Sequence, residues 1–543
     1  MKKVSVNVSE YFRLPNPGLK GTFDRIKQGT EEEYRTPLFP NRSVQQVLSD
    51  WMEHLEDLKS EWPGLYDFEL DLSRKVGPLS VMKPLDQRMA DIESYWHDIS
   101  LHAVPLDSRA EEAVRREWIH CSGMNLRSQK RTVENMKLST NSGSPFYTKR
   151  RSVVGDTIPC NTYAAIDDVD TIIQKLPSGT YKACAVLGWR GQEGGPQIDD
   201  IKQRTVWMMP FALNVQELQL YQPFIELCQR YEYVPAWISN ESVDNHITKL
   251  FDTKGSRDPI ICTDFTKFDQ HFNPTLQACA HNLLKGWLVD NDSTQDWLRE
   301  VFPIKYHIPL MIQYGEIITG HHGMGSGSGG TNADETIVHR TLQHESAILS
   351  GVHLNPHSMC LGDDGILSYP NIDVDTVVEH YSSHGLEMNP DKQSVSTDEC
   401  VYLRRWHNKN YRVNGICVGV YSTCRALGKL LEQERFIGKA ILRSGKEIEY
   451  QKILILRSLS ILEQVKFHPL RESFVDFVLK GDRYRLGLSI PGFFDSKNLN
   501  SLSEVATSSN TDVIGYNLQQ MSKGEYAKGI NDWWIVKYLR SKQ

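Results

Sequence analysis

The sequence "CLGDDGIL" at residues 360–367 places Asp363 and Asp364 side by side, with Gly362 and Gly365 flanking the pair. Apolar residues border this quartet on both sides (Met359, Leu361, Ile366 and Leu367). Glycine and Asp-Gly favour the positive φ angles of tight turns, so residues 357–369 are predicted to form a β-hairpin. Two adjacent carboxylates at such a turn repel each other, and a bound cation would make them tolerable.

A third acid follows a separate apolar run. In "DPIICTDFTKFD", residues 258–269, the β-branched stretch after Pro259 predicts a buried strand that ends at Asp264. Mg²⁺ prefers hard oxygen ligands and is commonly held by one or two carboxylates plus substrate phosphates. Two such ions roughly 3.5 to 4 Å apart can serve an in-line phosphoryl transfer. We therefore expect Asp264 and Asp363 to bridge two metals, with Asp364 in support.

A Gly/Ser loop from Gly323 to Gly330 leads into an amphipathic helix in "GMGSGSGGTNADETIVHRTLQHESAIL". Thr331 is the predicted N-cap of that helix, with Asp334 at the matching N3 position. The loop also satisfies G-x-G-x-x-G, a pattern of dinucleotide-binding sites, in which an acid follows about 20 residues later. Here the next strand-end acid, Asp363, lies 33 residues after Gly330 (363 minus 330), which disfavours that reading.

Composition restricts the class of protein. The chain has 543 residues, with 40% hydrophobic and 10% aromatic residues, which fits a large globular protein. We find no 18-residue apolar stretch and no secretory signal, so we expect an intracellular protein without membrane association. None of the ten cysteines forms a C-x-x-C pair, which argues against a zinc ribbon or a disulfide framework.

The net charge of −7 (61 minus 68) means that a nucleic acid would have to be held by a local basic surface. Residues 125–151 carry seven basic residues against Glu134 alone, and Lys202, Arg204 and Arg190 form a second group. Elsewhere, helical periodicity predicts an amphipathic helix over 43–62. The Ser, Asn and Thr-rich run 495–512 predicts a mobile loop.

The order of these motifs carries a family resemblance. Asp264-x4-Asp269, then Ser326-Gly327-x3-Thr331, then Gly362-Asp363-Asp364 resembles motifs A, B and C of right-hand viral RNA-dependent RNA polymerases. Four further stretches are similar to motifs G, F, D and E of that family: "TNSGSPF" (140–146), "KQRTVW" (202–207), "GLEMNPDKQS" (385–394) and "VYLRRW" (401–406). The combination most resembles polymerases of double-stranded-RNA viruses of the picobirnavirus kind, with partitivirus polymerases next.

The resemblance implies an α+β right-hand fold with fingers, an antiparallel-sheet palm and a thumb, closed by an N-terminal extension. It implies an extension over 1–75 that links fingers and thumb, and fingers over 76–250. The palm would span 251–412, with a finger insertion at about 271–319, and the thumb with its C-terminal loop 413–543. We expect the 495–512 loop to enter the product channel and to support or restrain primer-independent initiation.

The resemblance also implies roles for individual residues. Asp264, Asp363 and Asp364 would hold two Mg²⁺ ions, with Mn²⁺ as a possible substitute, and Lys392 would act as general acid for the pyrophosphate leaving group. The expected nucleotide-binding residues are Lys202, Arg204, Arg190, Asp269, Ser326, Gly327, Thr331 and Asn332. The expected template and primer contacts are Ser142, Gly143, Pro145, Lys149, Arg150, Arg404 and Arg405.

One position departs from the family pattern. Four residues after Thr331 the family usually has Asn, and this chain has Glu335. Recognition of the ribose 2′-OH through an Asn contact to Asp269 is therefore in question. Asn332 would replace that Asn if the helix start were shifted. The sequence leaves open whether Glu335 or Asn332 takes part.

The predicted function is RNA-directed RNA synthesis for replication and transcription of a viral genome. We expect RNA, nucleoside triphosphates and a capsid protein as partners, and action in the virion interior and the host cytoplasm. A reverse transcriptase is one alternative, but it typically has Tyr-x-Asp-Asp where this chain has Leu361 and Gly362 before the acids. A noncatalytic RNA-binding viral protein is the other alternative, although it would need no acids in separate motifs.

Overall fold

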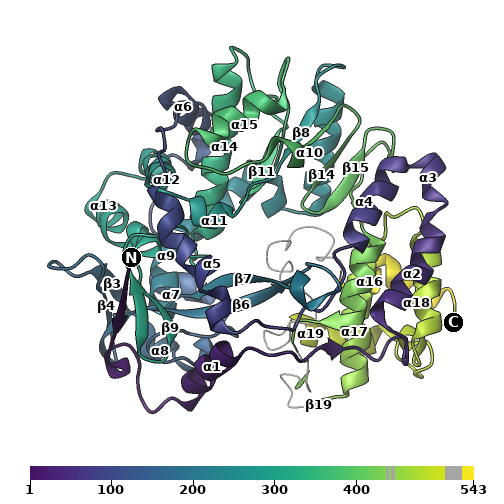
Figure 1. Cartoon of the computed structure of the whole chain (residues 1–543), viewed down its shortest axis with the longest axis horizontal. Helices are drawn as coiled ribbons and strands as arrows, with labels where there is room; N and C mark the ends of the chain where they lie inside the picture. The colour runs from purple at the N-terminus through teal and green to yellow at the C-terminus, as the bar shows by residue number, and fades with distance from the viewer. Residues whose placement is uncertain (436–439, 442–446, 508–528) are drawn as a thin grey trace.

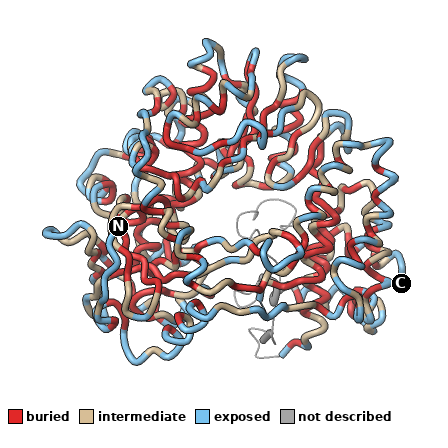
Figure 2. The backbone as a smooth tube through the Cα atoms, viewed as in Figure 1, coloured by how far each residue is buried: buried red, intermediate tan, exposed pale blue. Residues whose placement is uncertain are grey.

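The structure is a computed structural model that describes residues 1–435, 440–441, 447–507 and 529–543. Its elements form a closed ring, across which strands β6 (Ala185–Gln192) and β7 (Lys202–Met208) extend (Figure 1). Buried residues concentrate in the lobes on either side, whereas this pair of strands becomes more exposed towards its tip (Figure 2). Among the described residues we find no helix long and apolar enough to cross a membrane.

The central sheet has the strand order β11 (Met359–Leu361), β12 (Asp364–Leu367), β8 (Ile260–Thr263) and β13 (Ser394–Ser396). Every neighbouring pair is antiparallel. The predicted strand before Asp264 is β8, and the predicted hairpin is β11 and β12, which pair Leu361 with Asp364. Both predictions are confirmed, and Gly362 at the turn adopts φ +57°, a conformation that glycine accepts readily.

The two faces of the central sheet bury different partners because successive side chains of a strand alternate. Ile260 and Ile366 pack into a cluster with Val243 and Ile247 of α10 (Asn240–Thr253). Ile261 and Leu367 face the largest core cluster, which includes Ile337 of α14 (Thr331–Leu349). Helices therefore cover both faces and leave the turn end of the sheet for the acids.

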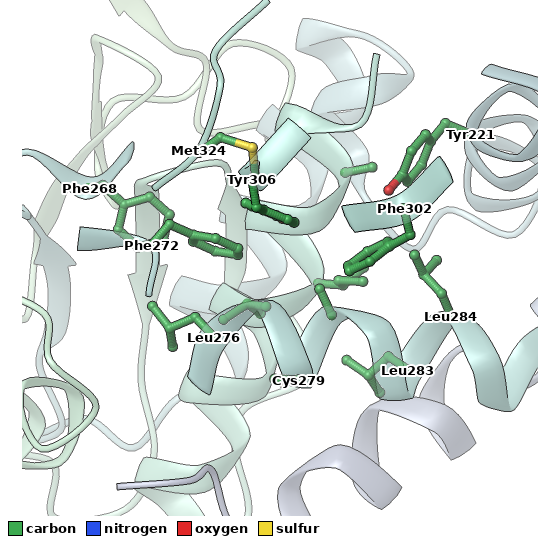
Figure 3. Close-up of a cluster of buried hydrophobic side chains, with 14 of the residues drawn as sticks. Tyr221, Phe268, Phe272, Leu276, Cys279, Leu283, Leu284, Phe302, Tyr306 and Met324 are labelled. Atoms are coloured by element: carbon green, nitrogen blue, oxygen red, sulfur yellow. The ribbon is translucent and has the colours of Figure 1, made fainter. Parts of the chain in front are cut away.

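The largest core cluster continues below the Gly/Ser loop. Phe272 and Tyr306 stack at 5.9 Å between ring centroids, and Phe302 lies 5.7 Å from Tyr306. Figure 3 shows these rings with Met324 of the loop above α12 (Pro274–Trp287). All four of these residues are at most 4% exposed. The loop therefore begins on a closely packed aromatic base.

A second large cluster joins the N-terminal residues to the C-terminal helices. It contains residues of α2 (Val44–Leu55) and α4 (Pro63–Ser73), together with α16 (Thr423–Leu431), α17 (Tyr450–Glu463), α18 (Arg471–Gly481) and α20 (Trp534–Arg540). Strand β2 (Tyr34–Arg35) pairs with β17 (Glu432–Gln433). The same N-terminal segment begins with β1 (Lys2–Ser5), which pairs with β10 (Glu316–Thr319) on the other side of the ring.

Strand β10 continues through β9 (Leu310–Gln313) to β6 and β7 in one sheet. One further sheet consists of β3 (Asn161–Ala164), β4 (Ile172–Leu176) and β5 (Gly179–Ala183). Another consists of β14 (Glu399–Tyr402), β15 (Arg405–Asn408) and β16 (Val420–Tyr421). Strands β18 (Ala440–Ile441) and β19 (Glu447–Ile448) form a separate pair. Further helices are α1 (Pro17–Gln28), α3 (Leu58–Glu61), α5 (Leu85–His97), α6 (Ser108–Glu117), α7 (Gln129–Glu134), α8 (Val154–Thr157), α9 (Phe211–Arg230), α11 (Phe268–His271), α13 (Asp292–Asp296), α15 (Val374–Ser382) and α19 (Ser496–Thr507).

Three local predictions need correction. The loop predicted over 495–512 is wrong for Ser496–Thr507, which form α19, while 508–512 lie outside the described residues. Leu499 and Leu502, three residues apart, are buried on one face of α19, a helical spacing that the surrounding polar residues obscure. Thr331 is the first residue of α14, and the N-cap is Gly330. The single helix predicted over 43–62 is helical as expected, but a turn at Glu56 and Asp57 divides it into α2 and α3.

Candidate active site

Asp264 and Asp363 lie at the same end of the central sheet. Strand β12 pairs Gly365 with Thr263 of β8, so Asp264 leaves its strand beside the turn that carries Asp363. Gln393 holds the Asp264 peptide on both sides: its Oε1 accepts from the Asp264 N–H at 2.6 Å, and its Nε2 donates to the Asp264 carbonyl at 2.9 Å. Acids 99 residues apart in sequence (363 minus 264) are thus brought together by register.

Helix α14 holds the backbone of the turn. The Gly362 N–H donates to Thr336 Oγ1 at 2.9 Å, and the Gly362 carbonyl accepts from His339 Nδ1 at 2.8 Å. A Cβ on Gly365 would lie 2.5 Å from the His339 ring, so glycine is required for this close approach. Sequence reasoning did not identify Thr336 or His339, although they follow Asn332 at helical spacing.

The acids at this end of the sheet lack full compensation of their charge. Desolvation raises the pKa of Asp264 above its usual value, and the charges of Lys392, Lys75 and Lys202 lower it. Desolvation is likewise the main cause of the raised pKa of Asp363, followed by the charge of Asp269.

Asp364 is perturbed most clearly of the acids predicted to hold metal. Desolvation, followed by the neighbouring Asp363 charge, raises the pKa of Asp364 to about 7, and its Oδ2 accepts from the Leu403 N–H at 2.8 Å. Within the described residues, no three His, Cys, Asp or Glu side chains already form a metal cluster. The carboxylates nevertheless present the hard oxygen donors that divalent cations prefer, at one sheet end with excess negative charge, so the residues fit such ions.

A second acidic pair lies beside the turn. Arg204 Nη2 of β7 donates to Asp269 Oδ2 at 2.7 Å. Glu335 of α14 is 4% exposed. Burial, followed by the charge of Asp269 and a hydrogen bond with it, raises the pKa of Glu335 well above its usual value. The Glu335 Oε1 atom is buried without a hydrogen-bond partner. The structure therefore joins Arg204, Asp269 and Glu335 in one group.

Asn332 and Glu335 approach the Gly362 turn together. A Cβ on Gly362 would lie 3.6 Å from Asn332 Nδ2 and 3.4 Å from Glu335 Oε2. Trp237 Nε1 donates to Asn332 Oδ1 at 2.8 Å, which fixes the amide with its NH₂ group on the other side. Both residues that the sequence left open therefore lie at the site.

The other predicted residues of the Gly/Ser loop contact β7 or the loop itself. Ser326 Oγ donates to the Thr205 carbonyl at 3.2 Å, and Thr331 Oγ1 donates to the Gly325 carbonyl at 3.2 Å. A Cβ on Gly327 would lie 1.6 Å from the Trp207 carbonyl oxygen. The strand with Lys202 and Arg204 and the Gly/Ser loop are thus in direct contact.

The predicted template residues lie next to the start of α9. Ser142, Gly143 and Pro145 are buried, and the Ser142 carbonyl accepts from the Phe211 N–H at 2.8 Å. Lys149 Nζ donates to the Ser139 carbonyl at 2.8 Å. Arg150 Nη1 donates to the Lys137 carbonyl at 3.3 Å. These contacts hold the segment that contains residues 142–150 against the protein, and the Arg150 guanidinium faces the protein interior.

Three predicted basic residues form ion pairs with distant acids. Arg190 Nη2 lies 3.3 Å from Glu434, and Arg404 Nη1 lies 3.3 Å from Glu193. Both of these arginines have side chains more than half exposed. Arg405 is mostly buried and pairs with Asp244 at 2.7 Å.

Glu193 also accepts from Arg425 of α16. Sequence reasoning missed this acid, which joins the tip of β6 to the C-terminal lobe. Its position three residues after Arg190 in a glycine-rich stretch was the one available signal.

Comparisons with known proteins agree with this geometry. A family model described as viral RNA-dependent RNA polymerase matches residues 122–468. The chain is 51% identical over 546 residues to a potential RNA-dependent RNA polymerase of human picobirnavirus (strain Human/Thailand/Hy005102/-), with 100% of both chains covered. It is 50% identical to the crystal structure of the RNA-dependent RNA polymerase of a human picobirnavirus, at TM-score 0.92, covering 99% of this chain and 100% of that one. An insertion loop deletion mutant of such an enzyme matches at TM-score 0.90, with the same identity and coverage.

Proposed function

The chain belongs to the viral RNA-dependent RNA polymerases, and from this premise we propose that Asp264 and Asp363 hold the divalent cations of its active site, with Asp364 in support. The enzyme is an RNA-directed nucleotidyltransferase of the double-stranded-RNA virus type, acting on RNA and nucleotides. The reverse transcriptase and noncatalytic alternatives are not favoured. The observation that carries the proposal is the antiparallel register of Thr263 and Gly365, which brings the two acids to one sheet end.

The family generally uses divalent metal ions, and the donor chemistry supports two Mg²⁺ ions, with Mn²⁺ as an alternative. When bound, such ions offset the negative charge that develops as the 3′-OH of the growing strand attacks the α-phosphate of the nucleotide. The chain itself orients the donors: Gln393 holds the Asp264 peptide, and Thr336 and His339 hold the Gly362 turn.

We assign recognition of the triphosphate to Arg204 and Lys202. Arg204 supplies a planar fork of donors that suits phosphate oxygens, and its present partner is Asp269. Lys392 contributes charge near Asp264 and would protonate the pyrophosphate leaving group. Arg190 would join this group after release from Glu434.

We assign recognition of the ribose to Asp269, Asn332 and Glu335. The Asn332 amide is oriented by Trp237, so its NH₂ group is presented as a donor beside the turn. A neutral Glu335 carboxylic acid would donate to the Asp269 carboxylate, as the amide of the usual Asn would. Asp269 would then accept from the 2′-OH that distinguishes ribonucleotides. The Gly/Ser loop residues Ser326, Gly327 and Thr331 would border the same nucleotide.

For the nucleic acid, we assign the template to the segment with Ser142, Gly143, Pro145, Lys149 and Arg150, and the primer strand to Arg404, whose side chain is exposed. Arg405, which is paired with Asp244, would support the position of Arg404 rather than contact the primer strand itself. The resemblance alone further supports a capsid-protein partner, with action in the virion interior and host cytoplasm. Co-purification of the polymerase with assembled particles would test this association.

The central test is nucleotide incorporation on single-stranded RNA with Mg²⁺ or Mn²⁺. Asp363→Asn keeps the shape of the side chain and removes its charge, so we expect at least about a thousandfold loss of turnover with RNA binding retained. Asp375→Asn, an exposed acid of α15, is the matched control and should retain full turnover. Turnover of Asp363→Asn within tenfold of the parent would contradict the assignment, as would absence of synthesis by the parent with either metal.

A further inference from the structure

The Gly/Ser loop (Gly323–Gly330) has few side chains with which to hold its own shape. It is pressed between β7 and α9: a Cβ on Gly327 would overlap the Trp207 carbonyl, and one on Gly330 would lie 2.4 Å from the Tyr221 ring. Its middle part, Ser326–Gly329, is partly exposed, while the residues from Gly323 to Gly325 are buried. The shape of the exposed part must therefore be set by hydrogen bonds from neighbouring elements.

Glu217 of α9 makes such bonds. Its Oε1 accepts from the Gly329 N–H at 3.2 Å, and its Oε2 accepts a short hydrogen bond from Ser328 Oγ. The Ser328 Oγ in turn accepts from the Gly330 N–H at 3.1 Å. Glu217 is 0% exposed, so the position of its carboxylate is determined by packing, and it anchors three consecutive loop residues.

The same carboxylate connects to the predicted template segment. With the Asn214 amide oriented to satisfy both of its neighbours, its nitrogen donates to Glu217 Oε1 at 3.1 Å and its oxygen accepts from Arg150 Nη2 at 2.7 Å. Asn214 and Glu217 lie three residues apart on one face of α9. Arg150 also stacks its guanidinium on Phe211 at 5.3 Å. A continuous hydrogen-bonded path therefore runs from Arg150 to Ser328.

We propose that Glu217 is a positioning residue: it holds the Gly/Ser loop in the shape that meets the nucleotide and, through Asn214, ties that shape to Arg150 and the template segment. This inference rests on the proposed function, which places the nucleotide at the loop and the template at the segment. Glu217 contacts neither substrate in this assignment. It acts through Ser328 and Gly329.

Extension of an annealed primer by one nucleotide tests the positioning role. Glu217→Ala leaves two loop donors without an acceptor, and we expect the KM for the nucleotide to rise about tenfold or more with a smaller change in kcat. Glu217→Gln keeps an acceptor for Gly329 and a polar partner for Ser328, so its KM should stay within about threefold of the parent. Glu379→Ala, which removes an exposed carboxylate of α15, is the control and should leave the KM unchanged.

Ser328→Ala tests the same contact from the loop side and serves if Glu217→Ala fails to fold. It removes one loop contact and leaves α9 intact, so we expect the KM to rise about threefold or more. An unchanged KM in Ser328→Ala, or a Glu217→Gln variant as impaired as Glu217→Ala, would overturn the positioning role. A melting temperature lowered without any change in KM would show that the contact serves stability alone and would overturn the role equally.

A double-mutant cycle tests the path to the template segment. We expect Asn214→Ala and Glu217→Ala each to weaken binding of a short single-stranded RNA, measured by fluorescence anisotropy, and the double variant to bind much like Glu217→Ala. Non-additive losses of this kind indicate residues acting in one network. Fully additive losses, or unchanged RNA affinity in both single variants, would overturn the coupling.

These results separate the two levels of assignment. If the parent extends primers and Asp363→Asn does not, the proposed function stands whatever Glu217 does. If the parent makes no RNA with either metal, the proposed function fails independently of the loop.

Discussion

The catalytic turn, which carries Asp363 and Asp364, and the base of the Gly/Ser loop, which contains Lys305 and Asp334, both include buried or partly buried acids. They differ in whether a nearby positive charge compensates these acids. At the turn, Asp264, Asp363 and Asp364 all have raised pKa values because water is displaced without enough positive charge to compensate. Below the loop, Lys305 lies 3.0 Å from Asp334, and both side chains are 0% exposed.

The loop base satisfies its charges internally. Asp334 also accepts from the hydroxyls of Tyr221 at 2.6 Å and Tyr306 at 2.7 Å, and Lys305 donates to the Phe302 carbonyl at 2.9 Å. Buried charges are tolerated when paired and hydrogen-bonded in this way. In this comparison, the acids without compensating charge lie where divalent cations are proposed to bind, whereas the compensated Lys305–Asp334 pair belongs to the scaffold.

Lys305→Met would leave the loop base, like the turn, with a buried acid that has no compensating positive charge. It removes the cation and leaves Asp334 buried, so we expect a loss of about 3–5 kcal/mol in the free energy of unfolding, measured by urea denaturation. Lys409→Met breaks an exposed pair with Asp398 and should leave the stability nearly unchanged. Equal free energies of unfolding for the two lysine variants would contradict this comparison.

Lys305 also shows what sequence reasoning can and cannot reach. A lone lysine in the apolar run "VFPIKYHIPL" (301–310) is a signal of a buried cation, but its partner Asp334 lies in another element and cannot be read from the run. Arg405 shows the same limit: motif E predicted a primer contact, and the structure pairs it with Asp244, 161 residues away.

The turn and its neighbouring strand were predictable because their signals are local. A continuous β-branched apolar run after Pro259 locates β8, and the apolar residues around Gly-Asp-Asp locate β11 and β12, within a few residues. The meeting of Asp264 and Asp363 was expected because both are suited to hold metal, and the order of family motifs supported it, but the register that joins them, Thr263 with Gly365, is tertiary and has no local signal. Pairing across the ring, such as Arg190 with Glu434, has no local signal.

Glu217→Gln sharpens the comparison at an acid between the two regions. Burial, opposed mainly by Lys305, raises the pKa of Glu217 to about 7 from a usual value of 4.5. The folded state therefore favours the neutral acid, and the parent loses stability as pH rises from about 4.5 through 7. Ser328, Gly329, Asn214 and Asp334 are the other groups facing this carboxyl.

Glutamine has no such titration, so Glu217→Gln should gain stability relative to the parent across this window, by about 3 kcal/mol at most. Urea denaturation at pH 5, 6, 7 and 8 would measure the difference, which should level off above pH 7. A difference independent of pH would contradict the raised pKa.

Substitutions of Glu335, at the edge of the catalytic turn, have the smallest expected effect, which is a change in the preference for ribonucleotides. If it acts as a neutral donor to Asp269, Glu335→Gln should retain the preference for ribonucleotides over 2′-deoxyribonucleotides within about threefold, because glutamine is a donor of the same shape. Glu335→Ala should weaken that preference about tenfold. The ratio of kcat/KM for the two nucleotides measures it.

Glu379→Ala, an exposed residue of α15, is the control for loss of a carboxylate and should keep the parent's preference. If Glu335→Gln is as indiscriminate as Glu335→Ala, a charged carboxylate is required, and the neutral-donor assignment is wrong.

The pairing of β1 with β10 and of β2 with β17 has a consequence for biosynthesis. Strand β1 ends at Ser5 and its partner begins at Glu316, and β2 ends at Arg35 with its partner at Glu432. A ribosome releases the N-terminal strands long before it makes the segments that complete them. Contacts so distant in sequence form slowly, so strands β1 and β2 must wait for their partner strands until most of the polypeptide has emerged, and locking of the two lobes belongs to the final stage of maturation.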